Sequence, residues 1–367
     1  MIRPLEQSKK KKGFLESDIS IGGVGLTQIG LFAKNVAVML KAGLPITEAL
    51  TIAEDSAQGK FKKILQKILK SVEAGRPFSA SLKLYPKVFS NLFVNAVYAG
   101  ELSGNLEENL DHIADQLEKE KEIVTKVKSA MIYPIFILIA TFIMGLALAF
   151  FVLPQITPLF KGLKVELPIT TKVLIWISDA TQAHGIAIFS GIVIAITALL
   201  WVVKREWSKP VTHWLLLKTP FIKGITRNAN LARFCRTLGT LLKSGISIDR
   251  GVEITKNTAE NYYYRKALDT VSRRIGKGTT LSENLNVFEK EFPKLVTRMI
   301  RVGEESGKLE ETLLYLASYY EIEVDTATKR LATAIEPSLL IIIGLAVAGL
   351  ALSIITPIYE ITGNIER

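Results

Sequence analysis

Three uncharged apolar runs constrain the fold of this chain most. They cover residues 131–153, 185–203 and 337–355. A helix rises 1.5 Å per residue, so each run is long enough to cross a hydrocarbon core about 30 Å thick. We therefore expect an all-α membrane protein with three transmembrane helices, at 131–153, 185–203 and 334–356. The mean hydropathy of +0.28 agrees, and it excludes a purely soluble fold.

Basic residues next to these runs predict how the chain is oriented. Within 20 residues of the runs, eleven Lys and Arg lie on the side that carries the N-terminus, and four lie on the other side. Cytoplasmic flanks of membrane helices carry this excess of positive charge. We therefore expect residues 27–130 and 204–333 in the cytoplasm, and the loop 154–184 and the tail 357–367 outside. The lysine-rich residues 1–26 are typical of a flexible basic leader near an anionic membrane face.

A duplication organises the two cytoplasmic segments. Residues 100–108 return as 303–311, and 14 of 39 positions are identical between 75–113 and 278–316. Chance matching at this composition gives about two or three identities. The repeated unit is a cytoplasmic domain plus the span after it, and the middle span returns the chain to the same side. The matching continues to the residues that flank the spans, where Pro134 pairs with Pro337 and Pro154 with Pro357.

Each cytoplasmic copy has the apolar pattern of a helical bundle. Leu106, Leu110 and Ile113 recur at helical spacing in the first copy, and Leu309 and Leu313 do so in the second. Val- and Ile-rich alternation bounded by hairpin turns is missing from the sequence. We expect about six antiparallel helices in each copy, the last of which continues into the membrane.

The motif Gly-Glu-x-Ser-Gly occurs in both copies, at 100–104 and 303–307. Its second glycine suits the positive φ that ends a helix. Glu101 and Glu304 stand at the end of that helix, where a negative charge is mildly unfavourable. Beside a structural role, we therefore consider a partner contact, or a weak divalent-cation site of Glu101 with Asn105. The candidate contact residues are Gly43, Gly100, Glu101, Ser103, Gly104, Gly245, Gly303, Glu304, Ser306 and Gly307.

The sequence lacks the motifs of several common activities. It contains no Walker A segment, no His-Glu-x-x-His, no Cys-x-x-Cys and no Gly-x-Ser-x-Gly, and its one cysteine, Cys235, fits a helix core. We expect no enzymatic activity, no cofactor and no metal centre. The three apolar runs carry no Asp, Glu, Lys, Arg or His, so a transporter subunit is a remote alternative. The net charge of +11 is typical of the basic flanks of membrane helices. The sequence has no basic stripe interleaved with aromatic residues, so we expect no nucleic-acid surface.

These features together resemble one family, the inner-membrane platform proteins of type IV pilus machines and type II secretion systems, also called the F-protein family. The resemblance covers about residues 27–360. It depends on the Leu-x-x-Gly segments at 40–46 and 242–248, on both Gly-Glu-x-Ser-Gly motifs, and on Tyr133-Pro134 and Glu336-Pro337 at the flanking spans. The short lysine-rich leader departs from the longer N-terminal extension of many members.

The resemblance implies a non-enzymatic platform in a bacterial or archaeal cytoplasmic membrane, with the N-terminus inside and the C-terminus outside. Such proteins couple a cytoplasmic hexameric assembly ATPase to the extraction of pilin or pseudopilin subunits and to filament growth. They act in the lipid bilayer as homo-oligomers, with other inner-membrane assembly components. We favour a type IV pilus machine, with a type II secretion system as the alternative. A second candidate contact surface comprises Arg233, Arg236, Arg273 and Arg274.

Overall fold

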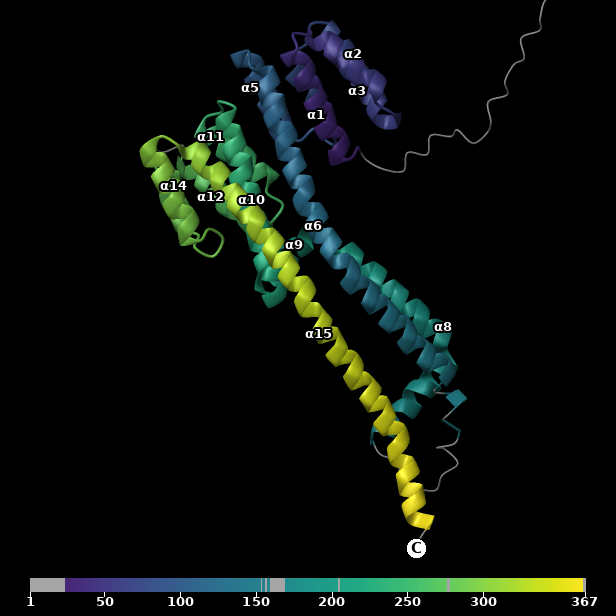
Figure 1. Ribbon diagram of the computed structural model, residues 1–367. Coiled ribbons are helices and arrows are strands. Elements are labelled where there is room, and N and C mark those ends of the chain that lie inside the picture. Colours follow the sequence, from purple (N-terminus) through teal and green to yellow (C-terminus); the bar gives the residue numbers. More distant parts are fainter. Residues whose placement is uncertain are drawn as a thin grey trace, which may run out of the picture. The chain divides into compact units, whose positions relative to one another are not determined.

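The chain is all-α over the part that the computed structural model describes, which confirms the expected fold class (Figure 1). That part comprises residues 24–152, 154–155, 157–158, 169–203, 205–275 and 278–365. The first copy contributes α1 (Leu26–Lys41), α2 (Ile46–Ser56), α3 (Gly59–Glu73), α4 (Phe78–Leu82), α5 (Asn91–Ser103) and α6 (Leu106–Ala147). The second contributes α10 (Pro220–Lys243), α11 (Ile248–Thr258), α12 (Tyr262–Ile275), α13 (Leu281–Asn286), α14 (Lys294–Ser306) and α15 (Leu309–Ile365).

The two sets of helices repeat in the same order, as the duplication predicts. Gly43 follows α1 with φ +89°, and Gly245 follows α10 with φ +80°. Both positions lie in the left-handed region, which glycine adopts without the steric penalty of a Cβ. These two glycines therefore end corresponding helices in the two copies.

The last helix of each copy is much longer than the others. α6 has 42 residues and is followed by the π-helical turn η1 (Leu148–Val152), and α15 has 57 residues. At 1.5 Å per residue these lengths are roughly 63 and 86 Å, about two to three times the hydrocarbon thickness. Each helix thus begins in one of the two bundles and continues into an apolar run. Pro134 lies inside α6, and Pro337 and Pro357 lie inside α15.

A third long helix, α8 (Ile169–Val203), contains the middle apolar run. Its backbone departs from helical geometry at His184, with φ −133° and ψ 25°. Its first half falls within the segment 154–184, which we expect outside the membrane. Lys172 and Asp179 interrupt the apolar character of that half. By length and composition, α6, α8 and α15 contain the three candidate membrane spans of the described residues.

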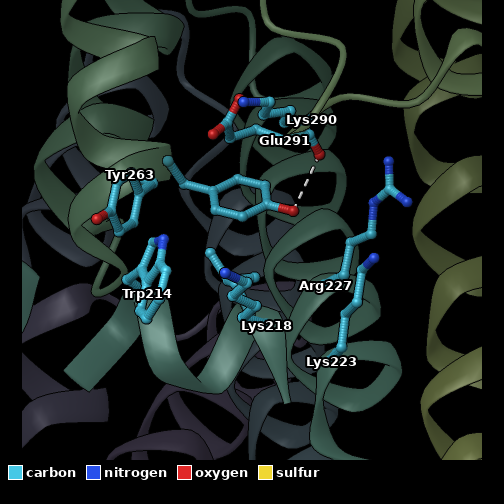
Figure 2. Close-up of a pocket in the computed structure, with 9 residues that line it drawn as sticks. Trp214, Lys218, Lys223, Arg227, Tyr263, Lys290 and Glu291 are labelled. Atoms are coloured by element: carbon cyan, nitrogen blue, oxygen red, sulfur yellow. Dashed lines mark hydrogen bonds between the residues drawn. The ribbon is translucent and has the colours of Figure 1, made fainter. Parts of the chain in front are cut away.

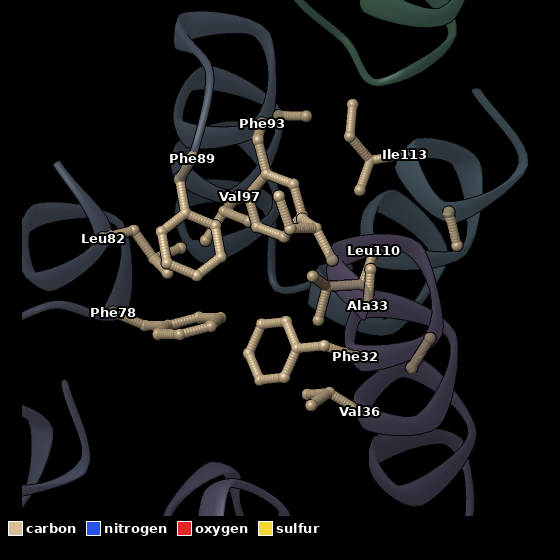
Figure 3. Close-up of a cluster of buried hydrophobic side chains, with 14 of the residues drawn as sticks. Phe32, Ala33, Val36, Phe78, Leu82, Phe89, Phe93, Val97, Leu110 and Ile113 are labelled. Carbon is tan, nitrogen blue, oxygen red and sulfur yellow. The ribbon is translucent and has the colours of Figure 1, made fainter. Parts of the chain in front are cut away.

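The first copy has a core of aromatic and aliphatic side chains (Figure 3). Phe32 of α1 makes an edge-on contact with Phe61 of α3, with 5.7 Å between ring centroids. Leu110 and Ile113 of α6 are completely buried in the same core. The apolar stripe identified at the start of α6 is therefore the surface that anchors this long helix to its bundle.

Packing groups the residues differently from the sequence repeat. One compact unit holds the described residues up to Lys121 together with Thr237–Thr258, and the other holds Glu122–Arg236 with the described residues from Ala259 on. The end of α10 and all of α11 therefore belong to the unit formed by the first copy. Leu241 and Ile254 are part of its hydrophobic core.

The second unit has its own aromatic core. Phe292 stacks edge-on against Phe234 and Tyr264, with ring centroids 5.0 and 5.4 Å apart. Cys235 is fully buried beside them, and burial raises the pKa of its thiol. The cysteine is therefore protonated at neutral pH, and it packs as the small apolar residue that its sequence context indicates.

Candidate functional site

Glu101 and Glu304 each cap a short helix that precedes them in the chain. The Glu101 carboxylate accepts hydrogen bonds from the backbone N–H groups of Phe78 (2.5 Å) and Ser79 (3.1 Å), and from the Ser79 hydroxyl. These N–H groups begin α4 and have no partner within that helix. Negative charge is favourable at this end of a helix. The charge of Glu101, which is unfavourable at the end of α5, thus stabilises the start of α4.

The second copy repeats this arrangement. The Glu304 carboxylate accepts hydrogen bonds from the backbone N–H groups of Leu281 (2.6 Å) and Ser282 (3.1 Å), which begin α13. The bonded residues lie 22 and 23 positions before the glutamate, as they do in the first copy. The geometry therefore accounts for both glutamates as internal structural links. The partner contact stays a prediction at these positions, as does the cation site with Asn105.

The first glycine of each motif lets two helices approach closely. A Cβ built on Gly100 would lie 2.9 Å from the Cα of Leu106 and 3.0 Å from the side-chain nitrogen, Nδ2, of Asn109. A Cβ on Gly303 would lie 3.0 Å from the Cα of Leu309. Cβ atoms rarely approach other heavy atoms this closely, so a larger residue at either position requires the neighbouring helix to shift.

The second glycine turns the chain between those helices. Gly104 has φ +76° and Gly307 has φ +70°, so both adopt the left-handed conformation that ends a helix. The serine between the glycines is exposed in both copies, and the Ser306 hydroxyl donates to the carbonyl of Val302 at 2.7 Å. The motif is therefore a tight joint between a bundle helix and the long helix that enters the membrane. The described residues include no cluster of His, Cys, Asp or Glu suited to a metal ion.

The four candidate arginines lie on α10 and α12, and three of them make ion pairs. Arg236 binds both carboxylate oxygens of Glu321, at 2.9 and 2.8 Å, and both side chains are mostly buried. This bidentate geometry fixes α10 against α15. At the surface, Arg233 pairs with Glu260 at 2.8 Å and Arg273 with Asp269 at 2.6 Å. The Arg274 carbonyl accepts a hydrogen bond from the Thr279 hydroxyl at 2.8 Å.

A cavity that we call the basic pocket lies in the second unit, close in sequence to the end of α8 (Figure 2). It has a volume of about 820 Å³, and α9 (Lys209–Lys218) forms one side of it. Its lining consists of Trp214, Leu217, Lys218, Lys223, Arg227, Tyr263, Tyr264, Lys290 and Glu291. Four cationic side chains stand against one carboxylate, so the pocket favours an anionic group.

Hydrogen bonds and one cation–π contact link the residues that line the basic pocket. The Tyr264 hydroxyl donates to the carbonyl of Glu291 at 2.9 Å, and the Lys218 ammonium lies 4.5 Å from the centre of the Trp214 ring. The Arg227 guanidinium donates to the carbonyl of Glu289 at 3.4 Å, and its Nε is buried without a hydrogen-bond partner among the residues that the structure describes. The sequence pattern does not predict this pocket, because Lys218 and Lys223 are among the basic residues that were expected only to flank a span.

Comparisons with known proteins agree with the fold. The family described as "Type II secretion system (T2SS), protein F" matches residues 32–154 and 234–357, so each match covers a bundle and the long helix after it. A type IV pilus assembly protein PilC of Thermus thermophilus is 36% identical, over 94% of this chain and 85% of the relative.

Two further relatives come from the two kinds of machine, one from a type IV pilus system and one from a type II secretion system. A type IV pilus assembly protein PilC of Pseudomonas aeruginosa is 31% identical over 99% of this chain and 96% of its own length. A type II secretion system protein F of Aeromonas hydrophila is 30% identical over 94% of this chain and 89% of its own length. These matches confirm the resemblance found in the motifs, and the chain belongs to the type II secretion system protein F family.

Proposed function

We propose that this chain is the inner-membrane platform protein of a type IV pilus assembly machine. Four relatives named as type IV pilus assembly proteins are 31–36% identical to it, and one named as a type 4 fimbrial assembly protein is 28% identical. Three relatives named type II secretion system protein F are 27–30% identical. The higher identities therefore favour the pilus over the secretion system.

The observation that carries this proposal is the continuity of α6 and α15. Leu110 and Ile113 anchor α6 in the first bundle, and Leu313 and Leu316 of α15 are equally buried. Both helices then run on into apolar segments without a loop. A displacement of the bundle by a cytoplasmic motor is thereby passed to the membrane, where pilin subunits are extracted.

The proposed role requires no catalytic group in this chain, because ATP hydrolysis belongs to the motor. We propose that a cytoplasmic hexameric ATPase docks on the bundles and that the basic pocket receives an acidic group from it. Lys218, Lys223 and Lys290 supply the positive charge of that surface. Arg236 is less suited to this role because it already binds Glu321 inside the protein.

The proposed topology places both bundles in the cytoplasm. Three spans put the termini on opposite sides, and the excess of flanking Lys and Arg puts the N-terminus inside. Labelling of single cysteines with an impermeant maleimide in spheroplasts tests this. We expect Lys172→Cys to react and Lys67→Cys on α3 to be protected until lysis; the reverse result contradicts the topology. Cys235, the one native cysteine, is buried and gives little background.

Deletion of the gene, with complementation by the wild-type chain, tests the function. Surface pili are counted by electron microscopy, and the culture supernatant is compared by mass spectrometry. We expect the pili to disappear and to return on complementation, with secreted proteins unchanged. Loss of secreted proteins with normal pili would instead assign the chain to a secretion system.

A further inference from the structure

One contact between the two sequence copies lies inside the first packing unit. α11 from the second copy packs against α5 from the first. Ile254 of α11 is 2% exposed, and Leu92 of α5 is 5% exposed. Arg250 of α11 donates to the side-chain oxygen of Asn95 on α5 at 3.4 Å. An apolar residue and a polar pair thus characterise the contact.

The duplication gives the chain a second version of the α11 surface, on α2. The segments 40–46 and 242–248 align with an offset of 202, so Ile52 corresponds to Ile254 and Glu48 to Arg250. Ile52 is 43% exposed, against 2% for Ile254, and Glu48 is also exposed. The surface of α2 therefore presents the apolar residue that its counterpart buries.

The chain also has a second version of the α5 surface, on α14. Here the offset is 203, so Leu295 corresponds to Leu92 and Arg298 to Asn95. Leu295 is 48% exposed, against 5% for Leu92, and Arg298 is exposed. The surface of α14 thus also presents an apolar residue that its counterpart buries.

The charges on these two exposed surfaces are complementary. Where the existing contact pairs Arg250 with Asn95, the equivalent contact between α2 and α14 brings Glu48 opposite Arg298. Opposite charges across an interface favour one register and disfavour like-charged alternatives. Burial of the two exposed apolar side chains adds the hydrophobic term that drives association.

We infer that α2 of one chain binds α14 of a second copy of this chain, in the way that α11 binds α5 within one chain. The contact is heterologous, since two different surfaces meet. Heterologous contacts close into a ring when the rotation between subunits permits it. Chains that share one membrane plane meet this condition when the rotation axis runs along the membrane normal. The inference concerns self-association and is independent of the proposed function.

Disulfide trapping between two tagged copies tests the inference in native membranes. One copy carries Ile52→Cys and the other carries Leu295→Cys, and mild oxidation is expected to give a product that contains both tags. The matched control replaces the first variant with Lys67→Cys, an exposed position on α3. A yield no higher than this control overturns the inference. A disulfide that forms only within a chain carrying both cysteines overturns it as well.

Charge reversal then tests the register. Glu48→Arg in the first copy, or Arg298→Glu in the second, is expected to lower the yield of the mixed disulfide about tenfold, because each creates a pair of like charges. The two reversals together restore the opposite charges and are expected to restore the yield. Both positions are exposed, so membrane levels of the variants should match the wild type. Failure of the combined variant to recover contradicts the proposed contact.

Discussion

Replacement of Glu101 by glutamine tests the structural account of the Gly-Glu-x-Ser-Gly motif. The carboxylate now accepts hydrogen bonds from the backbone N–H groups of Phe78 and Ser79 and from the Ser79 hydroxyl. Glutamine keeps one acceptor oxygen and places an NH₂ group where the second oxygen was. At least one of the three donors therefore loses its acceptor and faces the new NH₂ group.

The size of the effect follows from the burial of these donors. Phe78 is 2% and Ser79 is 3% exposed, so water does not replace the lost acceptor. A hydrogen bond to a charged group contributes about 1.5–3 kcal/mol, and an unsatisfied buried donor costs about 1–3 kcal/mol. Glu101 is itself partly exposed, so water offsets part of these two costs. We therefore expect the free energy of unfolding of the first unit to fall by about 2–4 kcal/mol. The melting temperature then falls by on the order of 5–10 °C.

The assay combines thermal unfolding by circular dichroism with hydrogen exchange over α4, on the full chain in detergent. Tryptophan fluorescence is unsuitable here, because all four tryptophans lie outside the first unit. Glu118→Gln, at an exposed position on α6, is the matched control and should leave both readouts unchanged. Wild-type melting and exchange in Glu101→Gln, combined with loss of pili, would refute the capping role and favour a partner contact.

Three further changes test other parts of the account. Gly100→Ala should destabilise the first unit by about 1–3 kcal/mol in circular dichroism melts, because its Cβ meets the Leu106 backbone at 2.9 Å; an unchanged melt refutes the close approach. A short Gly-Ser insertion after Ser129 in α6 should abolish pili at normal membrane levels of the protein, and normal piliation contradicts the continuous-helix mechanism. Burial lowers the pKa of His213, whose Nδ1 accepts a backbone N–H bond at 3.0 Å. The unfolded chain gains a proton there at a higher pH than the folded chain does, so stability falls as the pH drops from about 7 to about 5.5. In melts followed by tryptophan fluorescence, His213→Gln should reduce this fall, and an unchanged pH dependence would exclude His213 as its source.

Local patterns predicted most of the fold. The apolar runs and the helical spacing of Leu106, Leu110 and Ile113 depend on neighbours within a few turns, and the structure has the expected helices there. The positive φ of Gly104 was also predicted correctly, because the end of a helix favours glycine for a local steric reason. The match between the two copies predicted that both contain the same helices in the same order.

The features that local patterns do not predict depend on contacts between residues far apart in the sequence. The acceptor role of Glu101 involves donors 22 and 23 positions earlier, which no local pattern reveals. The basic pocket joins Lys218 of α9 to Tyr264 of α12 and to Lys290, and these separations exceed any helical repeat. α11 packs with the first unit although it belongs to the second copy, because core burial rather than chain order decides which residues group together.

The most direct measurement of the central claim is cross-linking in living, piliated cells, followed by purification of this chain and mass spectrometry of what is joined to it. A photoreactive residue at Lys223 samples the basic pocket, which the proposed topology puts in the cytoplasm, and one at Ile139 samples the first apolar run. We expect a cytoplasmic assembly ATPase to be joined at the first position and a pilin at the second. Recovery of the membrane-inserted chain with neither protein attached would contradict it.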